Sequence, residues 1–265
     1  MRPGQNPIER HLDVLRRAGV TAVRDAGRLA TNAHVAEGAS VRTAGAFLAP
    51  AGGIWPDLHA GVPADSLVPT ALAQLAEGAS WVKLIADFPG PDGDFLRARP
   101  TYDLDLVGEL VSSVHAAGGR VMAHVSSVLV ADLVRIGVDS IEHGPLADRA
   151  TIELMADLRT LWTPTITTII GYLGVLPMWR DTLPYAVARG VRVLAGSDEQ
   201  PIGDTWREVV ALAEHGGLTP RQALDAAGDV ARAALDLPAG PDDVVYYDVD
   251  PAEDLLVLAA PRLRA

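Results

Sequence analysis

The order of apolar and amphipathic segments constrains the fold of this chain more than any other feature. Short apolar runs, typical of buried strands, alternate with stretches whose apolar residues recur at helical spacing. The predicted strands are residues 19–25, 41–48, 81–87, 120–125, 138–142, 160–165 and 191–197. The predicted helices are residues 7–18, 71–77, 104–117, 131–136, 151–158, 185–189, 205–215 and one that opens at Thr219-Pro220. Strands and helices that alternate through short connections predict a parallel sheet.

Two architectures of parallel sheet suit a chain of 265 residues. An eight-stranded (β/α) barrel needs about 250 residues and one strand more than the seven predicted here. An open doubly wound sheet is the alternative, but no Gly-x-Gly-x-x-Gly turn follows the first strand, which weakens it. The hydrophobic content is 49% and the aromatic content only 5%, so the core is mainly aliphatic. Such a core is typical of strands that are buried on both faces.

Composition also narrows the function. Cysteine is absent, which excludes disulfides and thiolate chemistry. The net charge is −12 and no basic stripe appears, which argues against a nucleic-acid partner. The sequence has neither a signal-like start nor an apolar run long enough to cross a membrane. We therefore expect a cytoplasmic protein that acts on a small molecule, without nucleic-acid or membrane partners.

Lys83 is the only lysine, and the other basic residues among the 22 are arginines. It lies in the middle of the apolar run 81–87, where a charged amine is costly. Arginine cannot release its proton in a protein, whereas a buried lysine can become neutral and nucleophilic. The alternative is a lysine that extends from the end of its strand to solvent.

Polar residues stand at the ends of three other predicted strands. His124 and His143 each end a strand, and Asp198 follows the last one. In a barrel the carboxyl ends of all strands converge on one mouth, so these three side chains and Lys83 would meet. Two imidazoles with oxygen donors suit Zn²⁺ or a similar divalent ion. A lysine ammonium cannot bind the ion, because it has no lone pair.

Six segments occur along the chain in a fixed order. They are Gly-Val-Thr-Ala-Val-Arg-Asp-Ala-Gly (19–27), Gly-Ala-Ser-Trp-Val-Lys (78–83), Val-Met-Ala-His (121–124), Gly-Val-Asp-Ser-Ile-Glu-His-Gly (137–144), Trp-Thr-Pro-Thr (162–165) and Ala-Gly-Ser-Asp (195–198). Together they resemble the amidohydrolase superfamily, in its imidazolonepropionase-like and prolidase-like branch. The resemblance covers roughly residues 8–260.

The resemblance implies a (β/α)8 barrel and a role for each residue. Lys83 would carry a carboxyl group from CO₂ on its amine and bridge two metals. His124 and His143 would bind the second, more exposed metal. Asp198 would bind the first metal and act as general base on the bridging hydroxide. The family's reaction class implies metal-dependent hydrolysis of amide or cyclic-amide bonds.

The chain departs from the family's pattern at both ends. The family has a His-x-His pair on its first barrel strand, and this sequence contains no His-x-His. We therefore expect a barrel without its first strand and at most one tightly bound metal, zinc by preference. We expect residues 1–238 to form this barrel domain and 239–265 to be a remnant of the family's small β-sandwich. Unpaired barrel edges favour self-association of the chain.

Four further residues are candidate substrate contacts. Tyr102 lies in a loop after the Lys83 strand, Arg24 ends the first strand and could bind a carboxylate, and Thr165 ends another strand. His59 lies in a long loop that could act as a lid. An ordinary loop aromatic and a structural ion pair are the alternatives for Tyr102 and Arg24.

Three functions remain open from the sequence. The first is the metal-dependent hydrolase with Asp198 as base. The second is a degenerate member of the fold that binds or assembles without catalysis, which the missing His-x-His would explain. The third is a lyase that forms a Schiff base through Lys83, which a desolvated amine favours.

Overall fold

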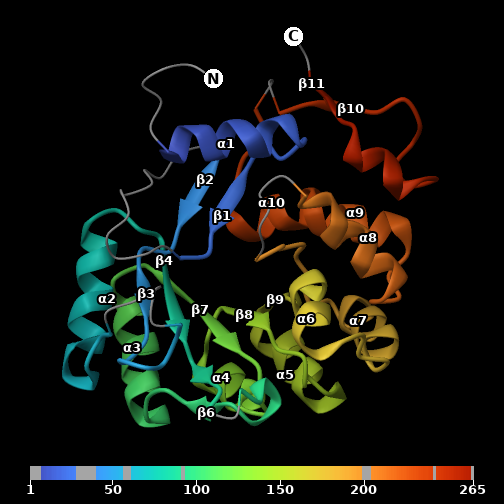
Figure 1. The fold of residues 1–265 in the computed structure, drawn as a ribbon. Coiled ribbons are helices and arrows are strands. Elements are labelled where there is room, and N and C mark those ends of the chain that lie inside the picture. Colours follow the sequence, from blue (N-terminus) through green and yellow to red (C-terminus); the bar gives the residue numbers. More distant parts are fainter. Residues whose placement is uncertain are drawn as a thin grey trace.

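The computed structural model describes residues 7–27, 40–55, 61–90, 93–198, 204–240 and 243–263. Its centre is a parallel sheet (Figure 1) in which each strand is hydrogen-bonded to the next. The strand order is β3 (Phe47–Leu48), β4 (Trp81–Ile85), β7 (Arg120–Val125), β8 (Ser140–His143) and β9 (Leu161–Thr163). The parallel sheet predicted from the sequence is confirmed.

Helices connect these strands and make the parallel order feasible. They are α2 (Leu67–Ala76) before β4, α3 (Leu104–Ala116) between β4 and β7, α4 (Val130–Ile136) between β7 and β8, and α5 (Arg149–Leu158) between β8 and β9. Each helix returns the chain to the start of the next strand, so all carboxyl ends lie at one edge of the sheet. Residues 124 and 143 therefore end neighbouring strands on the same side.

The first predicted strands form a separate parallel pair. β1 (Val23–Asp25) pairs with β2 (Val41–Thr43), and the predicted strand 41–48 is split into β2 and β3. Gly45, with φ of 66°, lies at the break, and this conformation favours glycine. The predicted strand 191–197 was too long, because in the structure only Val193 forms a bridge there, to Trp162. Closure into a barrel that lacks its first strand stays a prediction.

The remaining elements lie outside this sheet. The helices are α1 (Pro7–Arg17), α6 (Ile166–Leu173), α7 (Trp179–Ala188), α8 (Trp206–Glu214), α9 (Pro220–Ala227) and α10 (Asp229–Leu235). The predicted cap at Thr219 is confirmed as a capping box with Gln222. An antiparallel pair, β5 (Asp87–Phe88) with β6 (Arg99–Pro100), follows β4. The described helices are all too short or too polar to span a bilayer.

The last segment forms a small antiparallel pair. β10 (Val245–Tyr246) is hydrogen-bonded to β11 (Arg262–Leu263), with a 3₁₀ turn at Leu255–Ala259 between them. This pair lies within residues 239–265, the segment expected from the sequence to be a sandwich remnant. The division into a barrel domain and a sandwich remnant stays a prediction.

Apolar side chains cover both faces of the sheet. On one face they pack against α2 to α8, and on the other a smaller cluster joins Trp81 and Met122 to Leu194 and Leu235. All five residues of β4 are buried, which is the double-faced burial expected of a parallel strand. Lys83, at the centre of β4, is therefore inside the protein.

Candidate active site

Two histidine rings meet at the carboxyl edge of the sheet. His124 is on β7 and His143 ends β8, and their ring centroids are 4.6 Å apart at an angle of 78°. Burial lowers the pKa of His143 and lowers that of His124 well below the usual value, because a charged imidazole loses its hydration there. Both rings are therefore neutral at ordinary pH and keep a nitrogen lone pair.

Lys83 lies one strand away, on β4, and is only 5% exposed. Burial lowers the pKa of its amine, although the nearby carboxylates of Glu142 and Asp198 oppose this shift. A buried amine with a lowered pKa is more readily neutral, as predicted for this lysine from the sequence.

Asp198 stands at the edge of the same site. Its side chain is 51% exposed, and its Oδ2 atom lies 3.8 Å from Nε2 of His143. The carboxylate therefore has access both to solvent and to the histidine pair. This is the position that a group exchanging protons with an incoming water would occupy.

The hydroxyl of Thr165 fixes the protonation of His143. Oγ1 of Thr165 donates to the carbonyl oxygen of Pro164 at 2.8 Å and lies 2.5 Å from Nδ1 of His143. Because the hydroxyl proton is used on Pro164, the bond to the ring is donated by Nδ1–H. Nε2 then carries the lone pair and faces Asp198. The indole of Trp162 holds the same turn by donating to the carbonyl oxygen of His143 at 2.8 Å.

Three site residues have left-handed backbone conformations. The φ angles are 71° at His143, 47° at Thr165 and 48° at Asp198. For non-glycine residues this region costs of order 1–3 kcal/mol each, and such residues cluster at functional sites. The backbone strain thus coincides with the residues that the sequence motifs single out.

A buried ion pair lies beneath the site. Arg24 of β1 donates through Nη2 to Oε1 of Glu142 at 2.8 Å, and both side chains are about 95% buried. Burial raises the pKa of Glu142, but Arg24, Lys83 and a hydrogen bond from Ser140 outweigh it, so the pKa is lowered. Arg24 was a candidate substrate contact from the sequence, whereas its partner Glu142 was not predicted.

Asp87 organises the loop that follows His124. Its carboxylate accepts hydrogen bonds from the backbone N–H groups of Ser126 at 2.9 Å and Ser127 at 2.9 Å. Oδ1 of Asp87 is also 3.9 Å from Nε2 of His124. Burial raises the pKa of Asp87 despite these bonds. No pattern in the sequence around Asp87 indicated its bonds to the two serine amides.

Glu208 of α8 performs a similar role for α6. Its carboxylate accepts bonds from the backbone N–H of Ile166 at 2.7 Å and of Thr167 at 2.9 Å, and from the Thr167 hydroxyl at 2.7 Å. These are donors that the start of a helix leaves without partners. Burial raises the pKa of Glu208 to about 7. Glu208 thereby holds the residues that directly follow Thr165.

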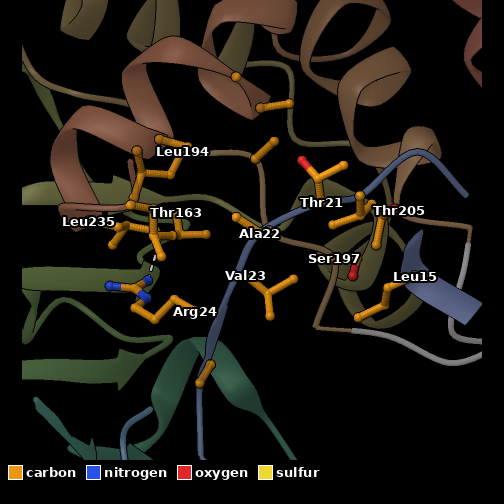
Figure 2. A pocket seen from close by; sticks show the side chains of 18 of the residues that line it. Leu15, Thr21, Ala22, Val23, Arg24, Thr163, Leu194, Ser197, Thr205 and Leu235 are labelled. Atoms are coloured by element: carbon orange, nitrogen blue, oxygen red, sulfur yellow. Dashed lines mark hydrogen bonds between the residues drawn. The ribbon is translucent and has the colours of Figure 1, made fainter. Parts of the chain in front are cut away.

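A cavity of about 880 Å³ opens beside these residues. It lies between β1 on one side and the segment from Leu194 to Asp198 on the other, and Lys83, His143 and Thr165 are among its lining residues. Figure 2 shows Arg24 directed toward Thr163, to which it donates a hydrogen bond, with Val23 and Ser197 among the other lining residues. A small-molecule substrate fits a volume of this size.

Two residues proposed as substrate contacts have other surroundings. Tyr102 is buried in the main core, and its hydroxyl donates to the carbonyl oxygen of Val62 at 2.7 Å. It does not line the cavity. His59 lies outside the described residues. Thr165 and Arg24 do line the cavity, and their contact with substrate stays a prediction.

A metal would fit the site on one chemical condition. Within the described residues, no three histidine, cysteine, aspartate or glutamate side chains gather closely enough to hold an ion. His124 and His143 supply two neutral imidazole donors, which divalent zinc accepts. The amine of Lys83, on the strand next to β7, becomes an oxygen donor once it carries a carboxyl group. The residues therefore fit a metal when Lys83 is a carbamate.

Comparison with sequences of known proteins finds relatives in mycobacteria and in Aspergillus niger. The chain is 31% identical over 224 residues to an uncharacterized protein of Mycobacterium bovis, covering 75% of this chain and 60% of that protein. It is 25% identical over 221 residues to ochratoxinase of Aspergillus niger, covering 71% of this chain and 45% of the enzyme. The chain thus spans about half the length of the curated relatives it matches. No family model matches it.

Solved structures share the fold over nearly the whole chain. A Xaa-Pro dipeptidase with methionine in its active site superposes with a TM-score of 0.75 at 23% identity, covering 98% of this chain and 79% of that one. The structure of A. niger ochratoxinase gives a TM-score of 0.74 at 20% identity, covering 97% and 74%. A structure described as an amidohydrolase gives 0.73 at 23% identity, covering 95% and 75%.

Proposed function

We propose that this chain, which belongs to the amidohydrolase superfamily, hydrolyses an amide or cyclic-amide C–N bond of a small molecule. One observation carries the proposal. The neutral rings of His124 and His143 are in contact at the carboxyl edge of the sheet, between a buried lysine and a solvent-accessible aspartate. Neutral imidazole nitrogens that can bind a metal, a buried amine and a solvent-accessible carboxylate base are the components that metal-assisted hydrolysis requires.

The proposal includes one divalent metal, zinc by preference. His124, His143 and Lys83 in its carbamate form would hold it. When bound, the ion would polarise the scissile carbonyl group and lower the pKa of water to about 7. Lys83 reaches the carbamate form only from its neutral amine, which is the state that burial favours. Arginine cannot take this role, because its guanidinium does not lose a proton.

The chain's own residues would carry the proton transfers. Asp198 takes a proton from the attacking water as the new C–O bond forms, and returns it to the leaving nitrogen as the C–N bond breaks. Thr165 keeps Nδ1 of His143 protonated, so that Nε2 remains a lone-pair donor toward the site. The pairing of Arg24 with Glu142 leaves the floor of the site close to neutral.

The experiment combines metal analysis with hydrolysis assays. The full chain is purified with zinc and bicarbonate, its metal content is measured, and a panel of N-acyl amino acids, dipeptides and cyclic amides is tested. We expect up to one metal per chain and a substrate whose turnover falls at least about 100-fold in Lys83→Arg, His143→Ala and Asp198→Ala. His115→Ala, an exposed histidine paired with Asp139 on the surface, is the matched control and keeps activity.

Two outcomes would overturn the proposal. Two metals per chain would contradict the single site, and an identified hydrolysis that survives all three substitutions would contradict the assigned residues. Carboxylation of Lys83 is measured separately by ¹³C NMR. Protein equilibrated with ¹³C-bicarbonate should show a carbamate signal that Lys83→Arg lacks.

The lowered pKa of Lys83 also favours a second candidate, a lyase that forms an imine with a carbonyl substrate. Borohydride reduction in the presence of carbonyl compounds separates the two. An adduct on Lys83 supports the lyase, whereas protein that remains unmodified supports the hydrolase. A chain that binds no metal and gives neither reaction would instead support a binding or assembly role.

A further inference from the structure

Aromatic residues are scarce in this chain, and several of the large ones gather in one place. The sequence contains three phenylalanines and five tryptophans among 265 residues. Two of the phenylalanines, Phe88 and Phe95, are in contact with Trp55 and Tyr172, and we call these four residues the aromatic cluster. The ring centroids are 5.3 Å apart for Trp55 and Phe88, 6.4 Å for Phe88 and Phe95, and 5.2 Å for Phe95 and Tyr172.

The sheet order places the aromatic cluster beside the candidate active site. Trp55 follows β3, Phe88 and Phe95 follow β4, and Tyr172 is on α6, which follows β9. In the sheet, β7 and β8 lie between β4 and β9, and these two strands carry the histidine pair. A row of touching rings that runs from the β4 loop to α6 therefore extends along the edge where β7 and β8 end.

Neighbouring contacts at each end of the row are consistent with this placement. Phe88 directly follows Asp87, whose carboxylate is 3.9 Å from His124, and packs against the cluster that contains Ile85. Ile85 is the strand partner of His124 across β4 and β7. At the other end, Tyr172 is on the helix whose first turn follows Thr165. Seven residues of helix correspond to a rise of about 10 Å, the length of a small substrate.

The aromatic cluster is not part of the core. Trp55 is 46% exposed and Tyr172 is 59% exposed, although both rings could have been buried in a core that is short of aromatics. Their mutual contacts are edge-to-face or tilted, the geometries that aromatic pairs prefer. The charges nearby offset one another, since Arg97 pairs with Asp94. The surface offers flat apolar contact rather than an ionic partner.

We propose that the aromatic cluster is the subsite for an aromatic group carried by the substrate. The ligand class is an amide whose acyl or amine portion bears an aryl ring, held with its amide at the histidine pair. This proposal rests on the proposed hydrolase function for its substrate, but it makes a binding claim that can be tested without turnover.

The binding test uses a fluorinated benzamide as the probe and ¹⁹F NMR titration of the full chain as the measurement. We expect binding that weakens about 5-fold or more in Trp55→Ala and Tyr172→Ala, as expected for loss of one aromatic contact. Trp55→Phe and Tyr172→Phe keep a ring and should bind within about 2-fold of the unaltered chain. Tyr246→Ala removes an equally exposed aromatic on β10 and is the control.

The kinetic test compares N-benzoyl and N-acetyl forms of one amino acid. We expect Trp55→Ala to raise KM about 5-fold for the benzoyl form and to leave kcat and the acetyl form within about 2-fold. Equal losses for both forms, or a probe that binds every variant alike or does not bind the unaltered chain, would overturn the subsite. Ring-dependent probe binding without any hydrolysis would keep the subsite and reject the hydrolase.

Discussion

Replacement of Glu208 by glutamine tests how the start of α6 is held. The carboxyl group is fully buried, and its pKa is raised from 4.5 to about 7 by desolvation, against three hydrogen bonds that favour the charged form. Because the folded-state pKa lies above the unfolded one, the protonated group stabilises the fold below about pH 4.5. This contribution is lost as the pH rises through about 7.

The magnitude follows from the two pKa values. Between about pH 5 and about pH 8, linkage predicts that this single group lowers the free energy of unfolding by about 2.5 kcal/mol. Glutamine has nearly the same shape and does not titrate in this range. The substitution itself lowers the free energy of unfolding, because the amide N–H₂ of glutamine faces the backbone donors of Ile166 and Thr167. This loss is the same at both pH values and cancels in the difference.

Urea unfolding of the original chain and of Glu208→Gln, each at both pH values, gives the four free energies needed. We expect the original chain to lose about 2.5 kcal/mol more than the variant does on going from low to high pH. The other titrating groups are common to both proteins, so their contributions cancel when the two pH-dependent changes are compared. A difference that stays constant within about 0.5 kcal/mol would refute the reasoning, because the carboxylate would then be ionised throughout.

Three further predictions follow from other contacts. Thr165→Val should abolish the preference of His143 for the Nδ1–H tautomer, seen in ¹⁵N NMR shifts of the ring, whereas Thr165→Ser should keep it. Arg24→Ala leaves the Glu142 carboxylate buried without its cation, so urea unfolding should show a loss of about 3–5 kcal/mol, absent in Arg207→Ala, which removes an exposed pair. Gly27→Ala would place its Cβ 2.5 Å from a ring carbon of the β3 phenylalanine at φ of 122°, and should lower the free energy of unfolding by about 1–3 kcal/mol.

The parallel sheet could be predicted because its signal is local. Each buried strand is a short apolar run, and β4, β7 and β8 were identified close to their observed bounds. The convergence of Lys83, His124 and His143 followed from the general rule that parallel strands end at one edge. The lowered pKa of Lys83 followed from burial, which an apolar run implies.

Other features depend on contacts that no local pattern encodes. Arg24 and Glu142 are 118 positions apart, and either could have found another partner at the sheet edge. Glu208 resembles any acidic residue in the first turn of a helix, where a solvent-facing position is the usual expectation. α6 was missed because Thr165 adopts a left-handed conformation that a β-branched residue rarely takes, so the sequence gives no ordinary start signal there.

The burial of Lys83 makes its amine a probe of how often the surrounding structure opens. Because no other residue carries a side-chain amine, an acylating reagent has one internal target among the side chains. That target is 5% exposed, so the reagent reaches it only in the fraction of time for which the surrounding structure opens. The rate of side-chain acylation would therefore report how often the cavity admits a small molecule.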